Sequence, residues 1–182
     1  MRVLAISGSL RAVSSNAILL RAAAALAPEG VEIVTYDGLS DLPHFNPDLD
    51  TALGDPRLPA AVRALRREVF AADAVLISSP EYAHGVPGSL KNALDWLVGG
   101  SEIPAKPVAL LNASPRSTHA QASLAETLRT MSAEVVEGSP FAAPLAGRGL
   151  DEAGALADPE VAAAIRGALA ALAAAAESRP RT

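Results

Sequence analysis

Short apolar runs alternate along the chain with stretches in which apolar residues recur every three or four positions. The first pattern indicates buried strands and the second amphipathic helices, and their alternation is typical of βαβ units in a mostly parallel sheet. Residues 2–7 lack polar alternation, so we expect a strand buried on both faces, whereas residues 31–36 alternate more, as suits an edge strand. We predict strands at residues 2–7, 31–36, 74–79, 107–112 and 134–137, and helices at residues 16–26, 60–71, 89–98, 119–131 and 157–177.

Residues 37–59 break this alternation, because the stretch is rich in Pro, Asp and Asn and its four prolines rule out a long helix. A loop of this length inside a compact domain is usually functional or part of an interface. The chain shows no internal repeat and no linker, and its 182 residues are about the length of one domain. We therefore expect a single domain over residues 1–182.

Composition narrows the range of functions. Half of the residues are apolar and the net charge is −5, which suits a folded core and argues against nucleic acid as a partner. The absence of cysteine excludes disulfides, thiolate metal sites and dithiol redox chemistry, so any redox role needs a bound cofactor. Arg63, Arg66 and Arg67 stand at helical spacing, and we expect them to form a solvated helix face.

Two apolar segments bear on localisation. Residues 1–6 are too few for a secretory h-region and lead directly into a Gly-Ser turn. Residues 161–176 are rich in alanine but include Arg166 and Gly167, so we expect a packing helix rather than a membrane span. These features predict a soluble, cytoplasmic protein that does not bind a membrane.

Three loops with unusual chemistry follow predicted strands: residues 8–16, 80–88 and 112–119. Ligands of open parallel sheets bind at the carboxyl ends of the strands, where the strand order reverses. We therefore expect these loops to meet at one edge of the sheet and to form the binding site.

The first loop contains more polar residues than a simple strand-to-helix turn needs. A helix N-terminus attracts anions through its free N–H groups, and Arg11 adds a cation suited to phosphate oxygens. The loop has neither the Lys of a P-loop nor the G-x-G-x-x-G spacing of a dinucleotide fold, so it suits a terminal monophosphate. The alternative is an ordinary helix cap made by Ser14 or Ser15, with Arg11 exposed.

The second loop and the predicted helix after it read S-P-E-Y-A-H-G-V-P-G-S-L-K-N-A-L-D-W over residues 79–96. This stretch closely resembles the signature of the NADPH-dependent FMN reductase family, in which P-E-Y precedes a Pro-Gly turn and an L-K-N-A-x-D-W helix. The G-S-L-R of residues 8–11, followed by Ser and Asn, resembles the phosphate motif of the same family. The two matches occur in the expected order and at the expected separation.

The resemblance implies an α/β, flavodoxin-like fold: a doubly wound, five-stranded parallel sheet of order 2-1-3-4-5 with helices on both faces. It implies non-covalent FMN, with NADPH or NADH as the electron donor and a ping-pong transfer to a quinone, a flavin, an azo dye or a metal oxyanion. The family commonly forms homodimers or homotetramers, for which residues 37–59 and the Trp96 helix are candidate contacts. Carried over by motif, the phosphate ligands would be Ser9, Arg11, Ser15 and Asn16, and the residues along the ribityl chain and flavin ring would be Pro80, Glu81, Tyr82 and Ala83.

We expect structural roles for the rest of the signature, with Asn92 and Asp95 holding the loop in place and Trp96 filling the core or an interface. No catalytic residue is predicted, because hydride transfer between nicotinamide and flavin needs no side-chain acid, base or nucleophile.

Two features depart from the family pattern. Ala83 stands where many members have Asn, and residues 113–119 lack the Gly-Gly pair that relatives often carry. Ser114 or Ser117 could still donate to the pyrimidine edge of the flavin. Arg116 could stabilise negative charge near N1 of the reduced ring, with a solvated loop residue as the equal alternative. These changes bear on the acceptor and the rate more than on FMN binding.

Other functional classes remain to be weighed. A flavodoxin-type electron carrier without NAD(P)H turnover is the main alternative, although aromatic residues are only 3% of the chain and favour an open flavin site. A member that keeps the fold but has lost FMN is a further alternative. His84 and His119 lack a second ligand at helical spacing, so we interpret them as polar loop residues and predict no metal site. A hydrolase is not indicated, since G-x-S-x-G is absent.

Overall fold

The computed structural model describes residues 1–178, and the remaining four residues of the predicted 1–182 domain lie outside this range. Its core is a parallel sheet with the strand order β2-β1-β3-β4-β5. This is the flavodoxin-like order implied by the sequence, and β2 lies at the edge, as predicted. The strands are β1 (Arg2–Ser7), β2 (Glu32–Tyr36), β3 (Ala74–Ser78), β4 (Pro107–Asn112), β5 (Glu134–Val135) and β6 (Phe141–Ala142). The helices are α1 (Ser15–Ala25), α2 (Ala60–Ala71), α3 (Gly88–Val98), α4 (His119–Thr130), α5 (Glu152–Ala157) and α6 (Pro159–Ser178), with 3-10 turns η1 (Gly38–Asp41) and η2 (Pro47–Leu49).

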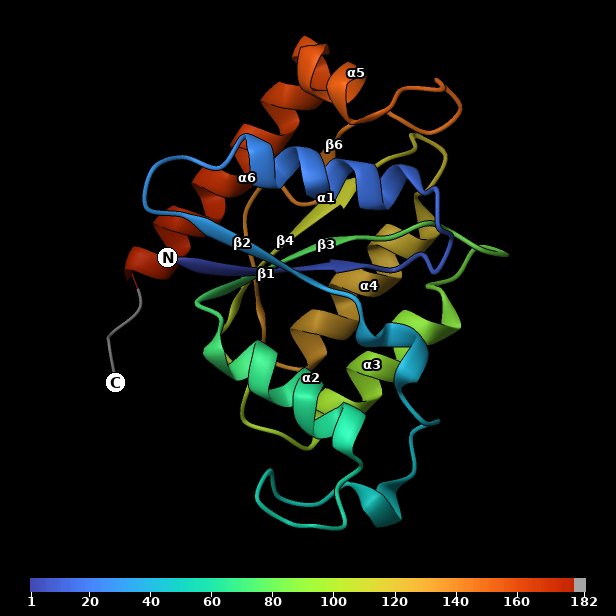
Figure 1. Cartoon of the computed structure of the whole chain (residues 1–182), viewed down its shortest axis with the longest axis vertical. Coiled ribbons are helices and arrows are strands. Elements are labelled where there is room, and N and C mark those ends of the chain that lie inside the picture. Colours follow the sequence, from blue (N-terminus) through green and yellow to red (C-terminus); the bar gives the residue numbers. More distant parts are fainter. Residues whose placement is uncertain (179–182) are drawn as a thin grey trace.

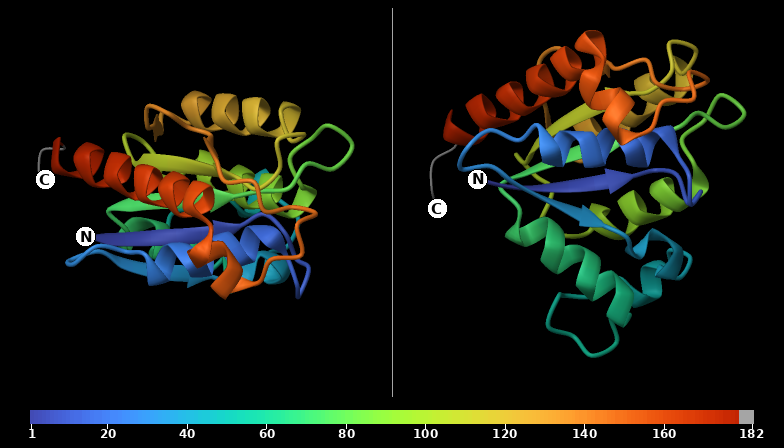
Figure 2. Two further views of the ribbon diagram at one scale, coloured as in Figure 1. Left: turned by 90° about the horizontal axis from the view of Figure 1, so that it is seen from above. Right: turned by 45° about the horizontal axis from the view of Figure 1, so that its top comes forward.

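The sheet separates two apolar cores. Because successive side chains of a strand point to opposite faces, Val3 of β1 lies in one core and Leu4 in the other. Helices α1, α5 and α6 cover the first face, and α2, α3 and α4 cover the second. Figures 1 and 2 show α1 and α6 on one side of the strands, with α2 and α3 on the other. The prediction of helices on both faces is confirmed.

The fifth position of the sheet differs from the prediction of one strand at residues 134–137. Two short strands share it, because β5 pairs with Pro107 and Val108 near the start of β4 and β6 pairs with the end of β4. Gly138 has a φ of +86° and Pro140 has no N–H to donate, so the chain leaves the sheet between the two strands. The short helix α5 was also missed; it begins after Asp151, whose side chain accepts from the N–H of Gly154 at 2.8 Å.

Helix α6 has the length and composition of a membrane-spanning helix. Its apolar stripe is nonetheless used inside the protein, since Val161, Ile165 and Leu169 are no more than 1% exposed and α6 packs on β4, α1 and α5. The prediction of a packing helix is confirmed.

The prediction of a solvated arginine face on α2 is wrong for Arg66, and also for Arg63, whose half-buried guanidinium donates to the carbonyl oxygens of Asp55 and Leu58. The Arg66 side chain is 3% exposed, and its guanidinium pairs with Asp50 at 2.5 Å. The same group donates to the carbonyl oxygens of Thr51 and Trp96 at 2.9–3.0 Å. Arg66 thereby fastens the segment after η2 to α2 and to the end of α3, a role that helical spacing alone does not reveal.

Replacing Arg66 should therefore destabilise the fold. In Arg66→Ala, Asp50 and two carbonyl oxygens lose their donors, and we expect the free energy of unfolding to fall by about 3 kcal/mol. The matched change Arg67→Ala removes an exposed arginine one position away and should alter stability by less than about 0.5 kcal/mol. Urea denaturation of both variants measures the difference; equal effects would contradict the role given to Arg66.

Candidate functional site

The three loops that follow β1, β3 and β4 lie at one edge of the sheet, as predicted (Figures 1 and 2). The strand order reverses between β1 and β3, and the first two loops touch at that point. Gly8 donates its N–H to the Ser78 carbonyl at 2.8 Å. A Cβ at Gly8 would lie 2.6 Å from Ser79 Oγ and 3.1 Å from Leu90, so only glycine allows this approach without displacement.

The N-terminus of α1 opens toward this edge without a cap. Ser14 occupies the N-cap position, but its side chain makes no capping hydrogen bond, and the first turn contains no acidic residue. The alternative interpretation, an ordinary cap by Ser14 or Ser15, therefore does not describe this helix. The N–H groups of the first turn and the positive end of the helix dipole are left for an anion.

The predicted phosphate residues differ in how they are held. Ser9 Oγ accepts from the N–H of Arg11 at 3.3 Å, so it shapes the loop. The Arg11 side chain is exposed, whereas Ser15 is half-buried at the first position of α1. Asn16 is 6% exposed, and its Oδ1 accepts from Ser78 Oγ at 2.9 Å, which ties α1 to the end of β3. Its direct phosphate contact stays a prediction.

The second loop contains a two-residue hairpin turn. Tyr82 and Gly85 exchange backbone hydrogen bonds at 2.9 and 3.1 Å, and the residues between them, Ala83 and His84, have φ values of +48° and +60°. Such a turn needs two left-handed residues, for which Asn and Gly are suited and Ala is not. The departure at residue 83 therefore changes backbone strain as well as removing an amide. Tyr82 is 51% exposed beside this turn.

Two contacts join the second loop to α4. Glu81 Oε2 accepts from the N–H of Ala120 at 2.8 Å, so the carboxylate caps α4, whose N-cap residue Thr118 makes no side-chain cap. The imidazole rings of His84 and His119 stack with their centroids 4.3 Å apart. The sequence motif gave Glu81 a place beside the flavin, and the structure adds a role in holding α4. Pro80, half-buried, lies at the start of the loop.

The third loop is a turn held by its own side chains. Asn112 accepts from the N–H of Ser114 and donates to the Ser117 carbonyl, both at 3.1 Å. Ser114 Oγ accepts from the N–H of Arg116, whose side chain is exposed, whereas Ser117 is 6% exposed. The loop thus keeps a defined turn without the Gly-Gly pair. Of the three predicted ligands in this loop, Arg116 has the most exposed side chain.

Two residues of this edge were missed by sequence reasoning. Asn112 fixes the third loop, and its signal was a polar residue at the last position of a buried strand. Gln121, 3% exposed, donates to the Ser79 carbonyl at 3.2 Å, and its Oε1 has no partner among the described residues. Its signal was an amide on the buried side of the first turn of α4.

Two residues of the signature, Asn92 and Trp96, hold the long segment at residues 37–59 in place. Asn92 accepts from the N–H of Phe45 at 2.8 Å and donates to the Pro43 carbonyl, which also accepts from Trp96 Nε1 at 2.8 Å. Trp96 is fully buried, which confirms its core role. Asn92 thus holds the segment at residues 37–59 and not, as was expected, the second loop. Asp95 pairs with Lys91 on α3 at 2.5 Å, so the prediction that Asp95 holds the loop is wrong.

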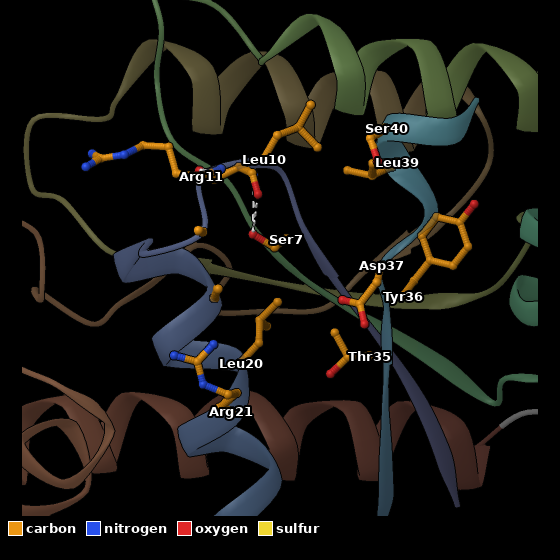
Figure 3. Close-up of a pocket in the computed structure, with 13 residues that line it drawn as sticks. Ser7, Leu10, Arg11, Leu20, Arg21, Thr35, Tyr36, Asp37, Leu39 and Ser40 are labelled. Atoms are coloured by element: carbon orange, nitrogen blue, oxygen red, sulfur yellow. Dashed lines mark hydrogen bonds between the residues drawn. The ribbon is translucent and has the colours of Figure 1, made fainter. Parts of the chain in front are cut away.

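A cavity of about 430 Å³ lies on the β2 side of the first loop. Figure 3 shows the Asp37 carboxylate directed into it, while the Arg11 side chain extends away. Burial, with Asp41 and Glu68 nearby, raises the pKa of Tyr36 to about 12, so its hydroxyl stays neutral at physiological pH. Two of the predicted phosphate residues, Ser9 and Arg11, are in the lining of this cavity, together with Arg21. Within residues 1–178 no group of three His, Asp or Glu side chains could hold a metal ion.

Comparison with known proteins identifies the family. The profile described as NADPH-dependent FMN reductase matches residues 1–147. The chain belongs to the NADPH-dependent FMN reductase family. The fold of this FMN reductase family member is similar to that of FerB from Paracoccus denitrificans, a flavoenzyme NAD(P)H:(acceptor) oxidoreductase, with a TM-score of 0.80, 31% identity and 97% of each chain covered.

Curated relatives match over shorter stretches. An NAD(P)H-dependent FMN reductase of Pseudomonas aeruginosa is 44% identical over 116 residues, which cover 63% of this chain and 60% of that protein. A quinone reductase of Escherichia coli K12 is 38% identical over 109 residues, covering 60% and 55%. The matches to these two relatives thus span less than two thirds of each relative's length.

Crowding at Gly8 gives a prediction on stability. In Gly8→Ala the new Cβ displaces Ser79 or the first loop, and we expect the free energy of unfolding to fall by about 1–3 kcal/mol. In Gly54→Ala, where nothing lies within 4 Å, the change should stay within about 0.5 kcal/mol. Adding Ser79→Ala removes the nearest oxygen and should recover part of the loss; a tolerated Gly8→Ala would show that the loops do not meet here. Thermal and urea denaturation check all three variants.

Proposed function

We propose that the protein is an FMN-dependent NAD(P)H oxidoreductase that passes electrons from NADPH or NADH to a quinone, flavin or other small acceptor in a ping-pong cycle. The observation that carries the proposal is the uncapped N-terminus of α1, with the exposed Arg11 beside it, at the point where the strand order reverses. Family membership and the names of the relatives agree with this function.

The residues of the edge fit FMN. The free N–H groups of α1 suit its phosphate, and the approach allowed by Gly8 brings that site next to the end of β3. When bound, FMN supplies hydride acceptance from the nicotinamide and electron donation to the acceptor. Ser9, Arg11, Ser15 and Asn16 would hold the phosphate, while Pro80, Glu81, Tyr82 and Ala83 would lie along the ribityl chain and the ring.

The third loop would contact the pyrimidine end of the flavin ring. Ser114 and Ser117 would face the pyrimidine edge, and the exposed Arg116 would place a positive charge near it. Such a charge favours an anionic reduced ring and so raises its reduction potential. The rest of the chain positions the flavin: the loops leave the ring open to a stacking nicotinamide, since Tyr82 is the only Phe, Tyr or Trp that they contain.

The domain extent, the oligomeric state and the cellular location are part of the same proposal. We propose one domain over residues 1–182, and a homodimer or homotetramer whose contacts include the edge where Leu10 and Val13 are 58% and 75% exposed. A cytoplasmic location is supported by the lack of cysteine and by the use of α6 in the core.

The visible spectrum tests the function directly. The purified protein should show flavin absorption bands, or acquire them with added FMN, and anaerobic NADPH or NADH should bleach them within seconds. Bands that bleach only with dithionite would instead indicate an electron carrier. A protein that shows no flavin and takes up none would refute the proposal.

Two arginines separate the phosphate end from the ring end. Arg11→Ala removes a charge-assisted hydrogen bond to phosphate and should weaken FMN binding by at least about tenfold. Arg116→Ala makes the same change at an exposed position of the third loop and should weaken binding by less than about threefold, shifting the flavin potential downward instead. Fluorescence titration of apoprotein with FMN measures both affinities, and equal losses would place the phosphate elsewhere.

A further inference from the structure

A second pocket lies away from the three loops, at the far end of α3. Three segments line it: Asp50–Leu53 after η2, Arg66 and Phe70 on α2, and Gly99–Glu102 after α3. We call it the Glu102 pocket; its volume is about 520 Å³. Helix α3 starts at the second loop and ends here, so about 16 Å of helix separates this pocket from the proposed flavin site.

One oxygen of the Glu102 carboxylate is enclosed without a donor. The residue is 5% exposed, and its Oε2 is buried with no hydrogen-bond partner among the described residues. A Cβ at Gly100 would lie 1.8 Å from that oxygen, so the carboxylate rests on the glycine backbone. A buried carboxylate without a partner is costly, and proteins normally match it with a donor or a cation.

The one cation in the lining is already committed. Arg66 donates to Asp50, to the Thr51 carbonyl and to the Trp96 carbonyl, which uses four of its five N–H groups. The pocket therefore keeps one negative charge, that of Glu102. Thr51 Oγ1 is likewise buried and without a partner within the described chain.

Two large apolar side chains are also in the lining. Phe70 is 67% exposed although it is a large aromatic residue, and Leu53 is the second. An aromatic face attracts an alkylammonium group, and an aliphatic wall covers its stem. A metal ion is less suited, because no group of three His, Asp or Glu side chains gathers here or elsewhere in residues 1–178.

We propose that the Glu102 pocket binds a protonated primary amine on a short aliphatic stem. The ammonium group pairs with the accessible oxygen of the Glu102 carboxylate and faces the Phe70 ring, and the stem lies against Leu53. This site goes beyond the proposed oxidoreductase function and does not depend on it, since none of its residues belongs to the three loops.

Titration with n-butylammonium chloride, followed by the backbone amide NMR signals of the full chain, tests the site. The Gly99 and Gly100 signals should shift saturably, beyond the shifts caused by NaCl at equal ionic strength. 1-Butanol, the neutral probe of the same length, should shift them weakly and without saturation. No saturation with n-butylammonium, or equal binding of 1-butanol, would overturn the proposal. The readout needs no flavin, so it is independent of the oxidoreductase test.

Matched variants assign the binding to the proposed groups. Glu102→Gln should weaken n-butylammonium binding by at least about tenfold, whereas Glu137→Gln, the same change at an exposed residue, should not alter it. Phe70→Leu changes an exposed side chain that the fold does not need, and should weaken binding by about threefold. Unchanged binding in Glu102→Gln would refute the site; if that variant does not fold, unchanged binding in Phe70→Leu does so.

Discussion

Gly8 donates its N–H to the Ser78 carbonyl and leaves room for the Ser79 side chain, so the loop after β1 lies directly on the end of β3. The rest of the edge follows from this approach. It sets where α1 begins and directs Asn16 toward Ser78. It also fixes the position from which the Pro80–Gly88 loop leaves the sheet. That loop contacts α4 through Glu81 and His84, and α4 directly follows the third loop. The position of Gly8 therefore also affects where the third loop lies. One residue without a side chain thus aligns three segments that are far apart in the sequence.

Most of the fold could be predicted from the sequence, because buried parallel strands and amphipathic helices have strong, local patterns. Strands β1, β3 and β4 and helices α2 and α4 lie within one or two residues of their predicted bounds. The parts that failed depend on non-local contacts. Residues 134–142 form two short stretches separated by Gly138 and Pro140, so their pattern does not show which residues pair with β4. Arg66 has the spacing of a surface arginine, and only the return of Asp50 from another segment makes it a buried one.

The site shows the same division. The motifs predicted which loops meet, because the ends of parallel strands share one edge. They did not predict how each side chain is used. Whether Ser14 caps α1 depends on its rotamer, and whether Glu81 faces a ligand or the N-terminus of α4 depends on how two loops dock. Asn112 and Gln121 act through the backbone of neighbouring segments; the sequence marks them as polar residues at the end of a buried strand and on the buried side of a helix, but does not show which carbonyl groups they reach.

The capping of α4 by Glu81 has a further consequence. The carboxylate belongs to the second loop, but the N–H it accepts from belongs to Ala120, a residue that is 1% exposed. If the loop swings outward, this amide loses its acceptor while the helix behind it stays in place. The exchange rate of a single amide hydrogen therefore reports how often the loop opens, without any label on the loop itself. A slow rate at Ala120 means that the edge is preorganised, and a fast rate means that it closes around its ligand.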